Sequence, residues 1–356
     1  DYSFIAITKY DIATIVKKSS ASAYINGIAI ADGADEANNA ITVSALDKIT
    51  ATATTKANSA GAGSGGTSLV SNTVTTQDAS AKVGMNAVLR STGSGNILIH
   101  SDTQDTLNAS IEASNVVLAD LAVVEAANVL KRTSTVEVGS GAEISSRYGS
   151  VMIYAYTAAN DMETNDDNND MSATATQGSK GIASFEAGPK AGNTLTQTAE
   201  IDIYQGSRIT AIFGDLTIKA VTNSRIRATV ERPSTALVAN NLSETTADIL
   251  DTAIVKIGVI PSGSLKGTQA YLNATRAAIG AYIGIQSVID SATSYTGSAG
   301  SNTKANDTIA FTDKVNVEID NAYIGGIDSL TIEAKILGMN IQSLTYSEIV
   351  GFTGKV

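Results

Sequence analysis

The stretch Thr135-Val-Glu-Val-Gly-Ser-Gly-Ala-Glu-Ile-Ser-Ser-Arg-Tyr-Gly-Ser-Val-Met-Ile-Tyr-Ala155 recurs without a gap later in the chain, as Glu200-Ile-Asp-Ile-Tyr-Gln-Gly-Ser-Arg-Ile-Thr-Ala-Ile-Phe-Gly-Asp-Leu-Thr-Ile-Lys-Ala220. The two copies share their apolar residues and two turn glycines, while the residues between these positions differ. The shared apolar residues are Val136, Val138, Ile144, Val151, Ile153 and Ala155, which correspond to Ile201, Ile203, Ile209, Leu216, Ile218 and Ala220, and the shared glycines are Gly141 and Gly149, which correspond to Gly206 and Gly214. Such a repeat specifies an architecture, and no residue in it identifies a reaction.

The same apolar-x-apolar pattern can be followed through the rest of the chain. The second apolar residue of each pair serves as a marker, and the markers are Ile30, Val83, Val138, Ile203, Ile257 and Ile319. Their spacing is near-regular, at about 53 to 65 residues, as expected of a repeat architecture. Short period-two runs separated by Gly, Asn, Asp and Ser are typical of strands and turns. Strands that recur in one order predict an all-β fold, a single-stranded parallel β-helix (β-solenoid), because stacked coils place alternate residues in one continuous core.

The size of the repeat predicts the overall shape. If a unit holds about three coils, the chain forms roughly 15 to 18 coils and an elongated rod of about 70 to 90 Å, at about 4.8 Å per coil. We expect residues 1–20 to be an entering segment or partial coil, and residues 21–356 to form a β-helix of about six degenerate units of about 53–65 residues. The extra length of some units lies in polar stretches, expected to be long loops that project from the rod, at residues 60–66, 161–193 and 291–306.

Two Ala-rich stretches, residues 118–132 and 268–279, are compatible with either a strand or a helix, because the two look alike over short apolar windows. The three prolines, Pro189, Pro233 and Pro261, are expected in loops or turns, since proline cannot donate a hydrogen bond to a ladder of buried strands.

The composition narrows the possible partners and compartments. The net charge is −11, from 35 acidic and 24 basic residues, and this argues against a nucleic-acid partner because a basic face is needed to replace phosphate counterions. The absence of cysteine rules out disulfides and thiolate chemistry and is compatible with secretion. No run of about 18 apolar residues is present to span a membrane. Asp1 is expected not to be the start of the gene product, since the N-terminus of the sequence shows neither an initiator Met nor a signal sequence.

The sequence offers few residues for a transition-metal site or for a histidine-activated nucleophile, because it has one histidine and no cysteine. The one histidine, His100, follows Ile97 and Ile99, and alternation places it outward, where other units have Tyr154, Lys219 and Glu333. We therefore expect His100 to face solvent and expect no cofactor. The run Asn165-Asp-Asp-Asn-Asn-Asp170 is a candidate calcium loop through Asp166, Asp167 and Asp170, although it lacks the spacing of an EF-hand, and a mobile acidic loop is the alternative.

Carboxylates are the remaining candidates for catalysis. Glu137, Asp202 and Glu318 occupy matching outward places in successive units. With about three coils between them they would lie about 14 Å apart, whereas the acid and base of a glycosidase lie about 5 to 10 Å apart. We expect them to be solvated surface residues, and we expect no catalytic residue in the chain.

The segments Val136-Glu-Val-Gly-Ser-Gly-Ala-Glu-Ile144 and Gly214-Asp-Leu-Thr-Ile-Lys-Ala220 resemble the repeats of large bacterial exoproteins of the filamentous-haemagglutinin type. The resemblance covers most of residues 24–344 and is strongest in three units. It implies a β-helical shaft that carries adhesive or toxic modules and is exported to the cell surface.

Two functions follow as hypotheses. The first is a non-enzymatic structural shaft of an extracellular bacterial surface adhesin or exoprotein, with self-association end to end or side by side into filaments or a surface layer as a variant, and with a cell-surface glycan or protein as a further partner. The alternative is a polysaccharide-binding or polysaccharide-degrading β-helix, which requires carboxylates on neighbouring coils or a cluster of exposed aromatics. Tyr148, Tyr154, Tyr156 and Tyr204 are candidates for such a cluster.

Overall fold

The structure, a computed structural model, describes residues 2–3, 6–33, 38–61, 64–157, 171–185, 188–261, 263, 267–298 and 300–351. Within these residues the fold is all-β, with fifteen strands in one sheet and no helix. All neighbouring strands are parallel. The strands are β1 (Tyr2–Ser3), β2 (Ala6–Ile25), β3 (Ile28–Ala31), β4 (Asn39–Gly61), β5 (Ser64–Val83), β6 (Val88–Ser91), β7 (Asn96–Val138), β8 (Glu143–Ser146), β9 (Val151–Thr157), β10 (Met171–Phe185), β11 (Lys190–Tyr204), β12 (Arg208–Val259), β13 (Ala270–Gly297), β14 (Gly300–Ile319) and β15 (Ala322–Val350).

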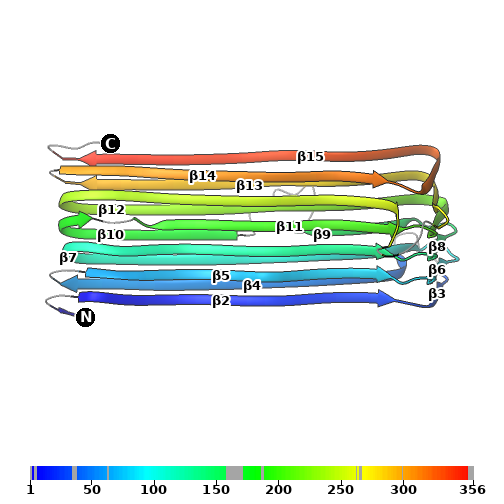
Figure 1. Cartoon of the computed structure of the whole chain (residues 1–356), viewed down its shortest axis with the longest axis horizontal. Helices are drawn as coiled ribbons and strands as arrows, with labels where there is room; N and C mark the ends of the chain where they lie inside the picture. The colour runs from blue at the N-terminus through cyan, green and yellow to red at the C-terminus, as the bar shows by residue number, and fades with distance from the viewer. Residues whose placement is uncertain are drawn as a thin grey trace.

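These strands form three rows, each made of segments that pair side by side. We call the first row outbound, because its segments run toward the turn into the short row. It consists of β2, β5, residues 120–138 of β7, β11, residues 244–257 of β12, and β14. A short row contains β3, β6, β8 and the first residues of β12, β13 and β15. The return row is β4, residues 96–117 of β7, β9 with β10, residues 216–240 of β12, and the remainder of β13 and β15. Figure 1 shows the long segments lying side by side, with β3, β6 and β8 gathered at one end.

One outbound, one short and one return segment in succession make one layer of the sheet. We call a set of residues that are partners from one layer to the next a column. Most of the sequence markers lie in a single column, since the successive partners in the outbound row are Val83, Val138, Ile203, Ile257 and Ile319. The first marker is wrong. Val83 pairs with Ile25, and Ile30 lies in β3 with 61% of its surface exposed. Both faces of β3 carry apolar residues, so alternation alone could not tell which face points inward.

Each sequence unit supplies one layer, which contradicts the prediction of about three coils per unit. The column from Ile25 to Ile319 advances by one whole sequence unit at every step from strand to strand. Several period-two runs join into one long segment, such as residues 216–240 of β12 in the return row. At about 4.8 Å per layer, the layers form a stack only about 30 Å high. The molecule is therefore longest along its strands (Figure 1) and not, as expected, along the stack.

The stretches expected to project as loops are largely strands. Residues 60–66 lie mainly in β4 and β5, residues 171–185 and 190–193 in β10 and β11, and residues 291–306 mainly in β13 and β14. The two Ala-rich stretches are also strands, in β7 and β13. β2 crosses residue 20 without a break and pairs with β5, so residues 6–20 belong to the first layer. The reason is that a polar residue facing outward is as acceptable in a strand as in a loop.

Pro189 and Pro261 lie outside strands, but Pro233 lies inside β12, contrary to expectation. The pairing of β10 with β12 passes from Glu231 directly to Ser234. The missing N–H of Pro233 therefore falls where that ladder is interrupted.

The turn glycines of the repeat have the conformations that the sequence predicts. Gly141 and Gly206 have φ angles of 71° and 78°, a region that side chains with a Cβ rarely adopt. Gly214 is needed for a different reason, since a Cβ there would lie 2.2 Å from the backbone oxygen of Gly149. These glycines allow the chain to turn tightly at both ends of the short row.

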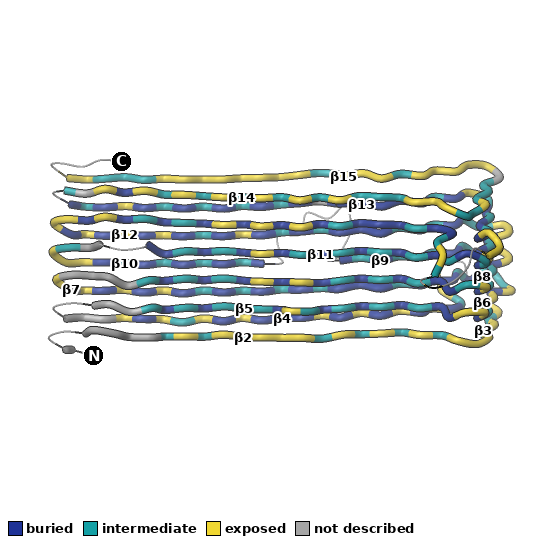
Figure 2. The backbone as a smooth tube through the Cα atoms, viewed as in Figure 1, coloured by how far each residue is buried: buried dark blue, intermediate teal, exposed yellow. Residues whose placement is uncertain are grey.

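The apolar core runs through all layers between the outbound and return rows. The ten residues predicted to share it are each 0% exposed and belong to one cluster: Val136, Val138, Ile144, Val151, Ile153, Ile201, Ile203, Ile209, Leu216 and Ile218. Two smaller clusters lie farther from the short row, and the outermost consists mainly of alanine. Figure 2 shows alternating buried and exposed positions along the inner strands. The small side chains keep the two rows close, as the low aromatic content predicts.

Candidate functional site

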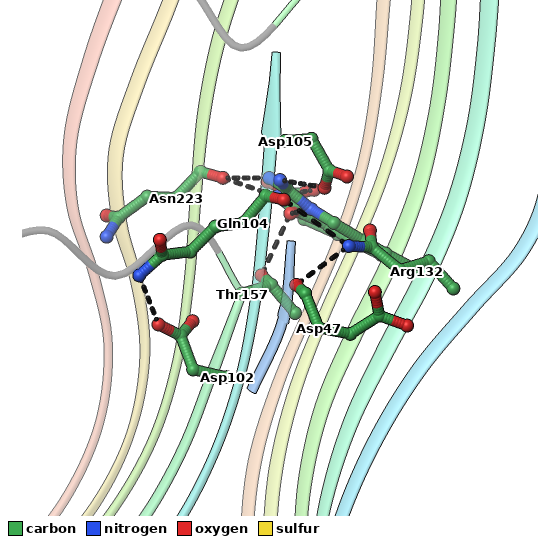
Figure 3. A network of polar contacts seen from close by, with 10 residues as sticks. Asp47, Asp102, Gln104, Asp105, Arg132, Thr157 and Asn223 are labelled. Atoms are coloured by element: carbon green, nitrogen blue, oxygen red, sulfur yellow. Dashed lines mark hydrogen bonds and ion pairs between the residues drawn. The ribbon is translucent and has the colours of Figure 1, made fainter. Parts of the chain in front are cut away.

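A belt of buried polar side chains crosses the core between the apolar clusters. On the outbound row it follows one column, whose members are Ser19, Gln77, Arg132, Gln197, Asp251 and Asp313. Ser19 and Asp313, in the first and last layers, are only partly buried. The return row contributes Asp105, Thr157 and Gln286, which are almost completely buried. Figure 3 shows part of this belt, around Arg132.

Arg132 lies at the centre of the belt and is 1% exposed. Its Nη1 is 2.9 Å from Oδ2 of Asp105, and its Nε donates to Oε1 of Gln197 at 2.8 Å. Its Nη2 donates to the backbone oxygen of Asn223 at 2.8 Å. Burial raises the pKa of Asp105, while the charge of Arg132 opposes that rise. The guanidinium thus connects one outbound strand to two segments of the opposite row (Figure 3).

The belt continues through carboxylates and amides on the later layers. Asp251 accepts hydrogen bonds from Nε2 of Gln197 at 2.6 Å and from Nε2 of Gln286 at 2.8 Å. Gln286 also donates to Asp313 at 2.9 Å. Burial raises the pKa of Asp251 to about 6. Because both rows contribute donors and acceptors, the belt fixes which residues meet across the core.

A second column of buried polar side chains is a ladder of asparagines. Nδ2 of Asn72 donates to Oδ1 of Asn128, and Nδ2 of Asn128 donates to Oδ1 of Asn193, both at 2.9 Å. Each amide also reaches the opposite row, where the acceptors are backbone oxygens of Asn108, Ser172 and Arg227. The ladder therefore pairs its buried amides from layer to layer, although Oδ1 of Asn72, at its start, has no hydrogen-bond partner.

A buried and a partly buried carboxyl group meet at the end of the stack that contains β14. Asp290 of β13 is 0% exposed and accepts a hydrogen bond from the backbone N–H of Ala228 at 3.2 Å. Asp307 of β14 accepts one from the hydroxyl of Thr245 at 3.0 Å. Burial, together with the nearby charge of Asp307, raises the pKa of Asp290 to about 7. One proton is therefore retained here at mildly acidic pH.

Neither column suits catalysis on a macromolecular substrate. The side chains of Arg132 and Asp105 are 0% exposed, and the apolar clusters enclose the belt. We interpret the belt as a device that specifies the pairing of the two rows, the use for which buried polar groups are best attested. Sequence reasoning missed both the belt and the asparagine ladder. The signal for the ladder is that Asn72, Asn128 and Asn193 recur at the intervals of the repeat.

The outward face of the return row carries His100. The residues predicted to share its place do so, because Tyr154, Lys219 and Glu333 all stand in its column. His100 is only partly exposed, however, and its ring meets that of Tyr156 edge-on at 5.6 Å. Burial lowers the pKa of His100, so it is neutral at physiological pH. His100 therefore faces outward, as expected, but it is only partly exposed to solvent.

The outward carboxylates of the outbound row are much closer together than predicted. Glu137 and Asp202 are direct partners in adjacent strands. The predicted separation of about 14 Å, or three layer spacings, is therefore wrong, because each unit is one layer. Lys256 follows Asp202, and Glu318 follows Lys256 in the same column. Burial and the charge of Glu200 raise the pKa of Asp202, while Lys256 opposes this rise.

Lysines hold these carboxylates in ion pairs. Nζ of Lys82 lies 2.5 Å from Oε2 of Glu137, and Nζ of Lys256 lies 3.5 Å from Oδ1 of Asp202. Lys256 also pairs with Glu200. The column is thus a ladder of opposite charges between layers.

The four tyrosines proposed as one cluster are divided among three places. Tyr154 and Tyr156 stack at 5.2 Å on the return row, and Tyr148 stacks on Phe213 at 5.5 Å. Tyr204 ends β11 in the outbound row, near Glu137 and Asp202.

A further aromatic pair lies on the short row. Tyr271 and Tyr323 stack at 5.0 Å, and the guanidinium of Arg208 lies 5.0 Å from the ring centre of Tyr271. Tyr323 is 46% exposed and Phe213 is 64% exposed. The end of the molecule at the short row therefore presents two exposed aromatic stacks.

The candidate calcium residues Asp166, Asp167 and Asp170 lie outside the described residues. Among the described residues, no group of three His, Cys, Asp or Glu side chains is arranged to hold a metal ion. The same residues include no helix long and apolar enough to cross a membrane.

Comparisons of the chain with protein-family models, with curated proteins and with solved structures found no match.

Proposed function

We infer that the chain is a single-stranded parallel β-helix with one coil per sequence unit, and that it acts as a non-enzymatic structural shaft. Its task is to space an adhesive or self-associating surface away from a cell. The place proposed for it is extracellular, at a bacterial cell surface.

The observation that supports this function most directly is the continuity of the columns. The column of Ile25, Val83, Val138, Ile203, Ile257 and Ile319 passes through every outbound strand. Each layer contacts only its neighbours, so stiffness accumulates by adding layers. The polar network around Arg132 lies inside the core, where it links the two rows.

The resemblance of residues 136–144 and 214–220 to filamentous-haemagglutinin-type repeats favours the same function. A negative net charge and the absence of cysteine are compatible with export and with a location outside the cell. A glycan or protein of a cell surface is the partner proposed for the exposed face.

A turnover assay tests this proposal. The purified chain is incubated with acidic and neutral polysaccharides, and new reducing ends and unsaturated products are measured over time. We expect no more turnover than with a matched variant that carries Glu137→Gln and Asp202→Asn. Turnover that this variant lacks would overturn the shaft function.

A second candidate function is a polysaccharide-binding or polysaccharide-degrading protein. It is favoured by the adjacent positions of Glu137 and Asp202, since paired carboxylates at about 5 Å are typical of retaining glycosidases. Against it, ion pairs with Lys82 and Lys256 hold both groups.

Binding without turnover has a separate test. Tyr271→Ala and Phe213→Ala would weaken glycan binding measured by calorimetry if the exposed stacks are the binding surface. Tyr24→Ala, an exposed aromatic at the other end of the stack, is the control.

A further inference from the structure

In the described part of the chain, the first and last layers have neighbouring strands on one side only, apart from β1, which pairs with Ala60 and Gly61 at the end of β4. At one end β14 pairs with β12 and β15 pairs with β13. At the other end β2 pairs with β5 and β3 pairs with β6. Figure 2 shows exposed positions predominating along β2 and β15, in contrast to the strands between them. Strand edges of this length are templates for pairing with another chain.

The last layer also leaves core positions open. Ile332, Ile336 and Ile341 of β15 are 46%, 52% and 45% exposed. Their partners in the preceding layer, Ile279, Ile283 and Val288, are 1%, 0% and 0% exposed. The isoleucines of β15 are exposed because no further layer covers them in the described part of the chain.

We propose that a second copy of this chain covers the last layer head to tail, with its β2 on β14 and its β4 on β15. This inference rests on the proposed shaft and names its partner. The described residues form a stack only about 30 Å high, and each added copy would lengthen the shaft by about the same amount.

The outbound strands that would meet match in length and pattern. β2 and β14 each have 20 residues, and both end at the turn into the short row. Continuing the inward columns of the outbound row places Ile25 of the second copy on Ile319 and Ala23 on Val317. Apolar residues therefore meet apolar residues at the end of this strand.

The return strands continue the same core. Extending the inward columns of the return row places Val43 of β4 in the second copy on Ile332. It likewise places Ala51 on Ile341. The second copy thus covers Ile332 and Ile341 with apolar side chains, whereas the column of Ile336 continues through the threonines of the polar belt to Asp47.

The charges along this junction are compatible. In the continued register, Lys17 and Lys18 of the second copy stand opposite Phe311 and Thr312, next to Asp313. Glu333 of β15 stands opposite Ser44. No described column brings two like charges together. Like charges directly opposite each other would destabilise a sheet.

The backbone of β2 is oriented for the junction. The carbonyl oxygen of Ile25 accepts from the N–H of Gly84, at 2.7 Å, so the polar groups of Ile25 face β5. Polar groups alternate in direction along a strand, and those of Ser20 and Ser22 therefore point away from β5. Because the two ends that join are different surfaces, each added copy leaves one end open, and the expected product is an open filament.

The test uses variants that block one end each. Ser20→Pro with Ser22→Pro removes two N–H groups that point away from β5, and Ser20→Ala with Ser22→Ala is the matched control. Ile332→Lys with Ile341→Lys places charge on the open core positions, and Thr331→Lys with Gln342→Lys, on the outward face, is its control. Circular dichroism checks that each variant is folded.

Sedimentation velocity and electron microscopy measure the assembly. We expect the wild type and both controls to form filaments that lengthen with concentration, with one copy per roughly 30 Å of axis. Each blocked variant should sediment as one chain of 36.4 kDa, at concentrations at least about tenfold above those at which the wild type assembles. An equimolar mixture of the two blocked variants should stop at a dimer, because one intact junction remains.

Three outcomes would overturn the proposal. They are a wild type that stays a single chain at every concentration, a wild type that stops at a closed dimer, and blocked variants that assemble as the wild type does. None of these bears on glycan turnover, so failure of the assembly and failure of the shaft can be told apart.

Discussion

Arg132 joins Asp105, Gln197 and Asn223 inside the core, and its loss leaves three buried groups without this partner. We predict that Arg132→Ala lowers the free energy of unfolding by about 3 to 5 kcal/mol, because an unpaired buried charge remains at Asp105. Chemical denaturation followed by circular dichroism measures this.

Removing both charges distinguishes pairing from simple loss of volume. Arg132→Met with Asp105→Leu should be less destabilised than Arg132→Met alone, since no buried charge is left. Lys56→Ala at the exposed Lys56–Glu112 pair is the control and should leave the denaturation midpoint unchanged. A double variant no more stable than the single one would contradict the role given to Asp105.

Asp290 makes the stability depend on pH. Its pKa is about 7 in the fold against 3.8 for an ordinary Asp, so the folded state binds an extra proton between these values. The stability that it contributes is therefore complete below about pH 3.8 and is lost as the pH rises through about 7. Relative to Asp290→Asn, which cannot ionise, the wild type should lose stability as the pH rises from about 3.8 to about 7, and the difference should level off above that.

Denaturation midpoints of both proteins across this range measure the difference. Asp78→Asn, on the outward face of β5, is the control and should follow the wild type. A constant difference between wild type and Asp290→Asn would show that Asp290 is ionised throughout.

At the scale of elements, the turns into the short row depend on glycine. We predict that Gly141→Ala destabilises the protein by about 1 to 2 kcal/mol, because φ is 71° and the added Cβ would lie 2.3 Å from Oδ1 of Asn86. Gly297→Ala is the matched control, since nothing lies within 4 Å of the position of its Cβ. Thermal denaturation compares the two, and equal losses would contradict the role of Gly141 as a required turn residue.

The strands themselves were only partly predictable. Alternation placed Ile97 and Ile99 inward and His100 outward, and the structure agrees. The same alternation cannot reveal whether three short strands or one long strand carries it, since the local pattern is identical. The pattern of residues 291–306 suggests a loop for this reason, because they are polar on one face and small on the other.

At the scale of the whole molecule, the decisive quantity is the number of residues per layer. Thr133 and Thr198 are partners on the outward face, one unit apart in sequence. We predict that Thr133→Cys with Thr198→Cys forms a disulfide on mild oxidation, since partners in adjacent strands lie within the range of Cα distances that a disulfide spans. The native chain has no cysteine, so no other disulfide can form within it.

Mass spectrometry of the digested protein detects this bond. The control is Thr133→Cys with Thr196→Cys, because Thr196 is the partner of Lys131 and lies two positions along the strand. Three coils per unit would leave the first pair about 14 Å apart and unlinked.

The sequence by itself determined the all-β class, the repeat, the inward column from Val83 to Ile319 and the turn positions at Gly141 and Gly206. These properties are local, because side-chain alternation and backbone freedom are set by residues close together in the chain. The tertiary structure alone decided that each unit is one layer, that Glu137 meets Asp202, and that Arg132 meets Asp105 across the core. Those contacts join residues far apart in the chain, and the register of long parallel strands is fixed only when whole layers pack on one another.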